Sequence, residues 1–312
     1  MPVSRTFKDR VGRGEFVITA EITPPLSADA ADLKQIALPL KGVADAVNVT
    51  DAASSRVHMG ALAAASLLAS WDIEPILQMT CRDRNRIALQ GDLVGAAALG
   101  IRNLLFLGGD DPKAGDQPDA KPVFDLDAVG LAETARRMRD QGTLPTGRAI
   151  AGKCDFLIGG VDAPIDPPAG WRPDRLAVKH KAGVEFVQTQ FCMDASLLRR
   201  YIARLADAGL VPSMHYIVGI APLASSKSAR WMREKLFGTI IPDAIVARME
   251  GAKDPVAEGI RICVELIAEF STIKGISGVH VMSPRNQAAI PVLIRDAKAQ
   301  LGRALGTPVP RI

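Results

Sequence analysis

The strongest constraint on the fold is an alternation that repeats along the whole chain. Short apolar runs of strand length are separated by longer segments in which apolar residues recur with helical period. Eight strands, each followed by a helical segment, are typical of an α/β fold of the (β/α)8 TIM barrel type, with a doubly wound open sheet as the alternative. The expected strands are Phe16–Ile22, Ala46–Thr50, Pro75–Thr80, Asn103–Leu107, Asp155–Gly159, Phe186–Gln190, Ser213–Gly219 and Gly278–Met282.

Capping residues mark several of the intervening helices. In the segment 194–209, Asp194 is placed to cap a helix and Gly209 to end it. Asp254 and Pro255 open another helix, because proline is tolerated in the first helical turn. A length of 312 residues suits one barrel, so we expect a single domain over 1–312 with a short N-terminal extension, 1–14, and a C-terminal tail, 304–312.

Composition narrows the class of protein. With 48% hydrophobic and 23% charged residues, the chain can bury a large core, and no run approaches the length of a membrane span. The net charge of +4 is spread without a basic block, which argues against nucleic-acid binding and suits anionic small molecules such as nucleotides or folates. The four cysteines are scattered, mostly in apolar runs, and the first residues lack a hydrophobic signal core. These features predict reduced core thiols and a cytoplasmic location.

Several common functional motifs are absent from the sequence. It contains no glycine fingerprint for dinucleotides after a strand and no P-loop. The four histidines show no zinc-type spacing, so we expect no metal site. His215 and His280 lie within expected strands and are interpreted as hydrogen-bonded interior groups. The favoured kind of site is therefore a ligand-binding site at one end of the barrel.

Polar side chains recur at the carboxyl ends of the expected strands, where TIM barrels have their active sites. Glu21 is the most informative of them. Burying a glutamate in a strand costs free energy unless its carboxyl group is paired or neutral, or has a functional role. Two loops rich in Pro, Gly and Asp, 110–125 and 160–173, follow the fourth and fifth strands. The whole set of strand-end residues is Glu21, Thr50, Asp51, Gln78, Thr80, Asp110, Gln188, Gln190, Ser283 and Arg285.

An ordered set of motifs resembles the methylenetetrahydrofolate reductase family, from about residue 15 to residue 295. Each motif alone is weakly specific for this family, but the order of the whole set along the chain is strongly specific for it. The closest similarity is to the branch that carries a Cys-Arg-Asp-Arg-Asn-Arg segment. The motifs are Ala20–Pro25, Val47–Asp51, Gln78–Arg86, Leu107–Pro112, Lys179–Gly183, Gln188–Phe191 and Gly278–Val281.

The resemblance implies a barrel that binds FAD, or FMN in some branches, at the carboxyl ends of its strands. It implies transfer of hydride from NAD(P)H to the flavin and then to 5,10-methylenetetrahydrofolate, giving 5-methyltetrahydrofolate by a ping-pong mechanism that can also run in reverse. The expected ligands are therefore flavin, folate and NAD(P)H. A homo-oligomer or a partner reductase subunit is also compatible with the resemblance.

The resemblance also assigns roles to individual residues. Glu21 matches the general acid that assists protonation of folate N10, and Asp110 matches an acidic residue beside the pterin and the flavin ring. The cofactor-binding positions are Thr50, Gln78, Leu107, Gly108, Gly109, Asp110, Asp162, Lys179 and Gln188. The substrate-binding positions are Glu21, Asp110, Gln190, Ser226, Met282 and Arg285.

The sequence departs from the family pattern at four of these positions and also over Gly160–Asp162, where the usual Tyr and His are missing. Gly108 replaces a common arginine, Gln78 a histidine, Ser226 an aromatic residue and Met282 a tyrosine. Two alternatives therefore stay open: a flavin- or folate-binding subunit that needs a partner for NAD(P)H oxidation, and a flavin-free pterin-binding barrel. Two interpretations of Arg82, Arg84 and Arg86 also stay open: they contact a phosphate group, or they are solvated residues at the start of a helix.

Overall fold

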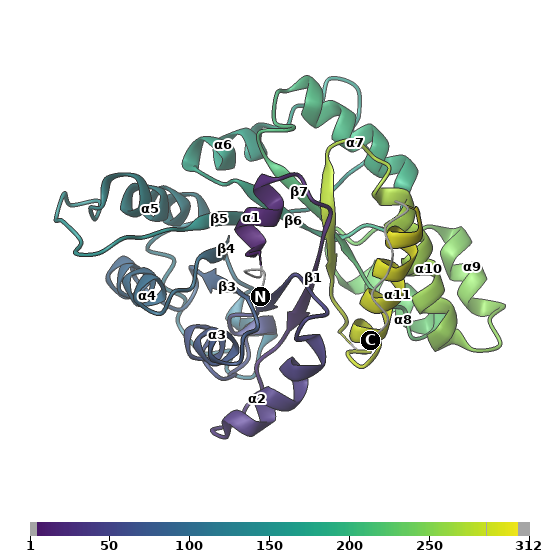
Figure 1. The fold of residues 1–312 in the computed structure, drawn as a ribbon, viewed down its shortest axis with the longest axis horizontal. Helices are drawn as coiled ribbons and strands as arrows, with labels where there is room; N and C mark the ends of the chain where they lie inside the picture. The colour runs from purple at the N-terminus through teal and green to yellow at the C-terminus, as the bar shows by residue number, and fades with distance from the viewer. Residues whose placement is uncertain (1–4, 285, 305–312) are drawn as a thin grey trace.

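The strands form a closed parallel barrel in the computed structural model, which describes residues 5–284 and 286–304. The order β1-β2-β3-β4-β5-β6-β7-β8 follows the chain, and β8 pairs with β1 to close the ring. This confirms the predicted (β/α)8 barrel (Figure 1). The strands are β1 (Val17–Ile22), β2 (Ala46–Val49), β3 (Pro75–Thr80), β4 (Asn103–Leu107), β5 (Leu157–Asp162), β6 (Phe186–Phe191), β7 (His215–Ile220) and β8 (Ile276–Val281).

Helices surround the barrel and pack their apolar faces on the outside of the strands (Figure 1). The α-helices are α1 (Phe7–Gly12), α2 (Ala30–Ala37), α3 (Ala61–Ser70), α4 (Arg86–Ala98), α5 (Ala128–Gln141), α6 (Asp174–Ala182), α7 (Ala195–Asp207), α8 (Ser226–Lys235), α9 (Asp243–Glu250), α10 (Pro255–Phe270) and α11 (Ala289–Ala304). Three short 3-10 helices are η1 (Leu38–Leu40), η2 (Ala53–Ser55) and η3 (Pro112–Ala114).

The predicted caps are present at both helices that the sequence singled out. Asp194 accepts a hydrogen bond from the backbone N–H of Leu197 at the start of α7, and Gly209 follows that helix with a φ of +74°. Asp254 accepts one from the N–H of Ala257 at the start of α10. These bonds satisfy N–H groups that have no partner inside the helix.

The largest boundary error concerns β5, which was expected to end at Gly159. The strand continues to Asp162, so the loop predicted to start at Gly160 begins later. A Cβ atom at Gly159 would lie 2.2 Å from the ring of Phe186. The glycine therefore makes room for an aromatic side chain of the next strand and does not end the strand.

The amino-terminal end of the barrel is closed by α1, which lies within the predicted N-terminal extension and covers the barrel in Figure 1. Phe7 packs edge-on against Phe186, with 5.5 Å between the ring centroids. The backbone N–H of Phe7 donates to Glu74, just before β3. This end is filled by an apolar cluster of Phe7, Val11, Val17, Ala46, Ile76, Leu105, Leu157, Phe186 and Ile217.

The rest of the apolar core lies between the strands and the surrounding helices. All four cysteines, Cys81, Cys154, Cys192 and Cys263, are buried as unpaired thiols, as expected. None of the helices within residues 5–284 and 286–304 has the length and apolarity needed to cross a membrane. Apart from residue 304 at the end of α11, the predicted C-terminal tail lies outside the described residues.

Candidate active site

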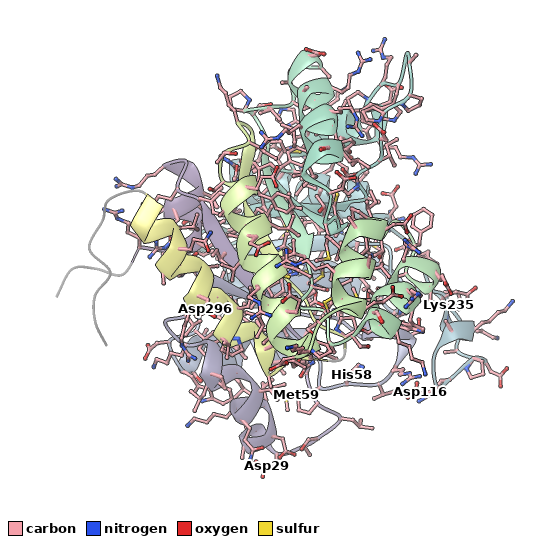
Figure 2. All side chains as sticks on the ribbon, turned by 90° about the vertical axis from the view of Figure 1, so that its right-hand side faces the viewer. Asp29, His58, Met59, Asp116, Lys235 and Asp296 are labelled. Atoms are coloured by element: carbon pink, nitrogen blue, oxygen red, sulfur yellow. The ribbon has the colours of Figure 1, made fainter. Side chains whose placement is uncertain are left out.

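A cavity of about 1220 Å³ opens at the carboxyl ends of the strands. His58 and Asp116, in the loops after β2 and β4, are drawn at this end of the molecule in Figure 2. The cavity brings together most of the side chains that the sequence placed at strand ends. The predicted site residues that line it are Glu21, Thr50, Gln78, Leu107, Gly109, Asp110, Asp162, Lys179, Gln188, Gln190 and Met282.

Two predicted positions among the described residues are not part of this lining. Ser226 is the first residue of α8, and neither it nor Gly108 belongs to the cavity wall. Arg285 lies outside the described residues. Ser226, where the resemblance implies an aromatic residue in the family, is therefore not part of the cavity wall.

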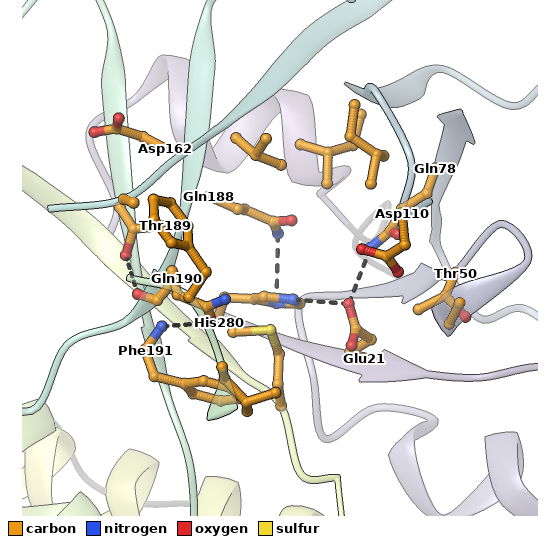
Figure 3. A pocket seen from close by; sticks show the side chains of 18 of the residues that line it. Glu21, Thr50, Gln78, Asp110, Asp162, Gln188, Thr189, Gln190, Phe191 and His280 are labelled. Carbon is orange, nitrogen blue, oxygen red and sulfur yellow. Dashed lines mark hydrogen bonds and ion pairs between the residues drawn. The ribbon is translucent and has the colours of Figure 1, made fainter. Parts of the chain in front are cut away.

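Glu21 lies at the floor of the cavity, near the end of β1 (Figure 3). Its Oε2 accepts a hydrogen bond from Gln78 Nε2 at 2.9 Å and lies 3.5 Å from Nε2 of His280. Within the part of the chain that the structure describes, Oε1 has no hydrogen-bond partner. The side chain is 23% exposed, so this carboxyl group is both anchored and accessible from the cavity.

A hydrogen-bond network continues from Glu21 into the barrel interior. Alternate residues of a strand face the same side, so Thr19 also points inward from β1. His280 Nδ1 lies 2.9 Å from Thr19 Oγ1, which accepts a bond from Gln188 Nε2 at 3.2 Å. Gln188 also exchanges bonds with Asn48 at 2.5 and 3.1 Å. Buried polar groups are tolerated when they are satisfied in this way.

His280 is the functional candidate that sequence reasoning missed. It was interpreted as a hydrogen-bonded interior group, and it is only 2% exposed, but it contacts Glu21 directly. Its position in β8, which pairs with β1, was the available signal. The other strand histidine, His215, is half-buried and lies 3.3 Å from Ser277 Oγ; burial lowers its pKa.

Asp110 follows β4 in a loop that packs on the loop after β2. The backbone N–H of Ser54 donates to Asp110 Oδ2 at 3.1 Å, and Ser55 Oγ donates to the Asp110 carbonyl at 2.9 Å. Gly109, with a φ of +98°, makes the turn that precedes it. A Cβ at Gly115 would lie 1.9 Å from the Ser55 carbonyl oxygen, so the two loops are in close contact.

The three arginines of the Gln78–Arg86 motif are all paired with carboxylates. Arg82 is 2% exposed and donates to Asp83, to Ser55 and to two backbone carbonyls. Arg84 pairs with two carboxylates and Arg86 with one, and these partners are Asp51, Asp92 and Asp125. The motif therefore ties together the loops after β2, β3 and β4, a role that neither sequence interpretation had included.

The opposite wall, beyond β5 and β6, combines buried polar groups with aromatic side chains. Tyr201 of α7 donates a hydrogen bond to Asp162, whose pKa is raised by burial. Lys179 of α6 donates to the carbonyl of Val161, and burial lowers the pKa of its ammonium group. Trp171 packs on Tyr201, with 5.4 Å between the ring centroids.

Phe237, in the loop after α8, lines the rim of the cavity and is 91% exposed. A Cβ at its neighbour Gly238 would lie 2.9 Å from Ala163 and 3.7 Å from Gln190. This loop therefore lies against the ends of β5 and β6. Gln190 accepts a bond from the Phe191 N–H at 3.0 Å, which fixes its side chain at the same wall.

Comparison with known proteins gives two curated relatives of low identity. One is "Probable methylenetetrahydrofolate reductase (NADPH)" of Caenorhabditis elegans, 25% identical over 75% of this chain. The other is "Methylenetetrahydrofolate reductase 2" of Schizosaccharomyces pombe, 24% identical over 72% of this chain. The matches cover 34% and 36% of these relatives, so the chain spans about a third of their length.

Two solved structures share the fold. A protein of Clostridium thermocellum that binds two copies of 5-methyl-5,6,7,8-tetrahydrofolic acid aligns with a TM-score of 0.61 at 16% identity, covering 94% of this chain and 98% of that one. A riboflavin lyase with modified FMN and riboflavin aligns with a TM-score of 0.53 at 9% identity, covering 95% and 93%.

The family comparison covers nearly the whole barrel. Residues 6–298 match the family "Methylenetetrahydrofolate reductase". This range includes all eight strands and the complete described lining of the cavity. The chain therefore belongs to the methylenetetrahydrofolate reductase family.

Proposed function

We propose that the protein reduces 5,10-methylenetetrahydrofolate to 5-methyltetrahydrofolate, using a flavin and NAD(P)H. The observation that carries this proposal is the Glu21 carboxyl group. It lies at the floor of the cavity of a family member, is held through Oε2, and has a side chain that is 23% exposed. An anchored acid at this position is what the ring opening of a folate substrate requires.

The residues present fit a flavin at this end of the barrel. Thr50 Oγ1, just after β2, is buried in the cavity wall and has no hydrogen-bond partner among the residues that the structure describes. Such a group is costly unless a ligand satisfies it. Leu107 and Gly109, at the end of β4, line the cavity on either side of Gly108. The cavity of about 1220 Å³ is larger than the ~300–1,000 Å³ of a typical small-molecule site, which suits a cofactor beside a substrate.

Thr50, the backbone at Leu107–Gly109 and Lys179 are the groups that would hold the flavin. When bound, the flavin would supply the centre that accepts hydride from NAD(P)H and returns it to the folate. Lys179 is a buried cation of the far wall, and its ammonium group suits an anionic or hydroxyl-rich part of the cofactor.

Glu21 would act on the folate as a general acid. Proton transfer to N10 of 5,10-methylenetetrahydrofolate opens the five-membered ring and leaves an iminium ion at N5, the form that accepts hydride. Asp110, on the facing loop, would stabilise the positive charge of the iminium.

The aromatic wall would receive the planar rings of the ligands. Trp171 and Phe237 offer flat apolar surfaces on the side of β5 and β6, next to the amide of Gln190. Flat rings bind well between such surfaces, because stacking adds to the burial of apolar area. The amide would read the polar edge of a pterin.

Release of the cofactor from the denatured protein, followed by assay of folate-dependent NAD(P)H oxidation, tests this proposal. We expect yellow protein, released FAD or FMN, and turnover of 5,10-methylenetetrahydrofolate. NAD(P)H–menadione activity of the isolated chain would show that no partner subunit is needed. Protein without flavin and without turnover, even after incubation with FAD and FMN, would contradict the proposal.

A flavin-free folate-binding barrel is the second candidate. Two observations favour it: the structural neighbour from Clostridium thermocellum binds 5-methyltetrahydrofolic acid, and Gln78, one of the expected flavin contacts, is bonded to Glu21. Binding of 5-methyltetrahydrofolate by colourless protein, measured by calorimetry, would support this candidate over the first.

A further inference from the structure

Gln78 lies beside Glu21, two strands away in the barrel. Its Nε2 donates to Glu21 Oε2 at 2.9 Å, and the side chain is 7% exposed. We propose that Gln78 is a positioning residue for the acid: it fixes Oε2 so that Oε1 presents the proton to the folate. This inference rests on the proposed function and replaces the flavin contact that the resemblance implied for Gln78.

Two polar groups from different strands converge on the same carboxyl oxygen. Gln78 reaches Oε2 from β3, and Nε2 of His280 lies 3.5 Å from it on β8 (Figure 3). Held between them, the carboxyl group cannot exchange its two oxygens by rotation without breaking the Gln78 bond. A protonated carboxyl group accepts at one oxygen and carries its proton on the other. The N–H of Gln78 therefore leaves Oε1 as the oxygen that carries the proton.

The position of Gln78 makes it suited to this task. It lies within a strand buried along its whole length and pairs in register with Leu105 of β4. His280 on β8 is the titratable group that lies against Glu21, and Asp51, His58 and Asp110 lie farther along the cavity wall. Gln78 is a neutral donor, so it orients Glu21 without changing the net charge of the site.

Kinetics of the variant Gln78→Met test the role, because methionine keeps the length of the side chain and removes the donor. We expect kcat for 5,10-methylenetetrahydrofolate to fall about 10- to 100-fold, as for a lost hydrogen bond to a reacting group. KM for the folate and NAD(P)H–menadione activity should stay within about twofold. The matched control is Gln35→Met on the exposed side of α2, which should retain full activity.

A double-mutant comparison separates positioning from direct cofactor binding. If Gln78 acts through Glu21, Gln78→Met should cause no further loss in a Glu21→Gln background, since coupled residues are not additive. Additive losses, or weaker flavin retention by Gln78→Met alone, would overturn the proposal.

Nuclear magnetic resonance gives a readout that does not need turnover. In protein with 15N-labelled glutamine side chains, the Gln78 amide is assigned by its absence from Gln78→Met. We expect its shift to follow pH in the wild type and in His280→Gln, but not in Glu21→Gln. A pH-insensitive wild-type signal, or the same titration in Glu21→Gln, would contradict the contact. If the wild type shows no folate reduction, the proposed function fails while this experiment still decides the role of Gln78.

Discussion

Glu74 lies at the end of the barrel that α1 closes, and Glu21 lies at the end that opens into the cavity. Both oxygens of Glu74 accept from the Phe7 N–H, at 2.9 and 2.8 Å, and Oε1 also accepts from Asn103 at 3.0 Å. Among the described residues, Gln78 and His280 both lie against one oxygen of Glu21, and the other has no hydrogen-bond partner. A carboxyl group with both oxygens satisfied holds structure together, whereas one with a free oxygen at a cavity is available for chemistry.

The side chains around Glu74 and Glu21 differ in the same way as the hydrogen bonding of these two carboxyl groups. Around Glu74 the barrel is filled by apolar side chains that pack under α1. Around Glu21 the interior carries the polar network of Thr19, Asn48, Gln188 and His280. In a TIM barrel, residues at the amino-terminal face usually contribute to stability, and residues at the carboxyl-terminal face usually contribute to catalysis. Variants at the two ends should therefore affect different properties.

Glu21→Gln should have the largest effect. The amide keeps the shape of the side chain but cannot donate the proton that opens the folate ring. We expect folate reduction to fall by about 10²- to 10⁴-fold, the usual contribution of a general acid. Flavin reduction by NAD(P)H, followed by stopped-flow absorbance, should be largely intact. An equal loss of both half-reactions would argue against the general-acid role.

Phe7→Ala should be the most damaging change at the closed end. It removes the fully buried ring that packs on Phe186, and such truncations cost about 3–5 kcal/mol. We expect a lower free energy of unfolding in urea, with kcat and KM of the folded enzyme unchanged. A large loss of kcat at unchanged stability would mean that the two ends are coupled.

The sequence predicted the barrel because its signals are local. Apolar runs, caps such as Asp194 and the Asp254-Pro255 helix start depend on neighbouring residues, and they were placed correctly. The end of β5 was wrong because Gly159 is explained by Phe186, a residue 27 positions away that the fold brings against it. Contacts of that kind are not visible in the pattern of a single segment.

Contacts between residues that are far apart in the sequence also limited the prediction of the site. Strand-end position was enough to collect Glu21, Asp110 and Gln190 at one cavity, but it could not show which of their neighbours touch. The contacts of Glu21 with Gln78 and His280 depend on the register between strands. Ser226 begins α8 and does not line the cavity, whereas Trp231 of the same helix does, a difference that the pattern of one segment could not show.

Thr50→Val should have effects of opposite sign on the free and the cofactor-bound protein. Without ligand, it removes a buried hydroxyl that lacks a partner, so we expect stability to rise by about 1 kcal/mol. Flavin affinity, measured by fluorescence titration, should fall by about two- to tenfold, as for one lost hydrogen bond. Unchanged affinity would remove Thr50 from the cofactor site.

Phe237→Ala should weaken folate binding moderately. Loss of one stacking ring corresponds to about 0.5–1.5 kcal/mol, or roughly two- to tenfold in Kd by calorimetry with 5-methyltetrahydrofolate. Ile87→Ala is the matched control, because Ile87 is 79% exposed on α4 and does not line the cavity. Equal behaviour of the two variants would show that Phe237 is an ordinary surface residue.

Glu74→Gln should have the smallest effect, visible as a change in pH dependence. Burial raises the pKa of Glu74 above its ordinary value of 4.5, so the folded state holds this proton more tightly than the unfolded state. That contribution to stability is complete below pH 4.5 and is lost as pH rises through the folded pKa. The wild type should therefore lose more stability than the variant between about pH 4 and pH 7 in urea titrations. The opposite order would contradict the assigned direction.

A crystal structure of the protein with bound 5-methyltetrahydrofolate tests most directly whether the free oxygen of Glu21 serves the substrate. We predict that Oε1 lies within hydrogen-bond reach of the folate, about 2.6–3.2 Å or through one water, while Oε2 remains bonded to Gln78. A folate bound elsewhere in the cavity, with Glu21 contacting neither the ligand nor a bridging water, would contradict the account.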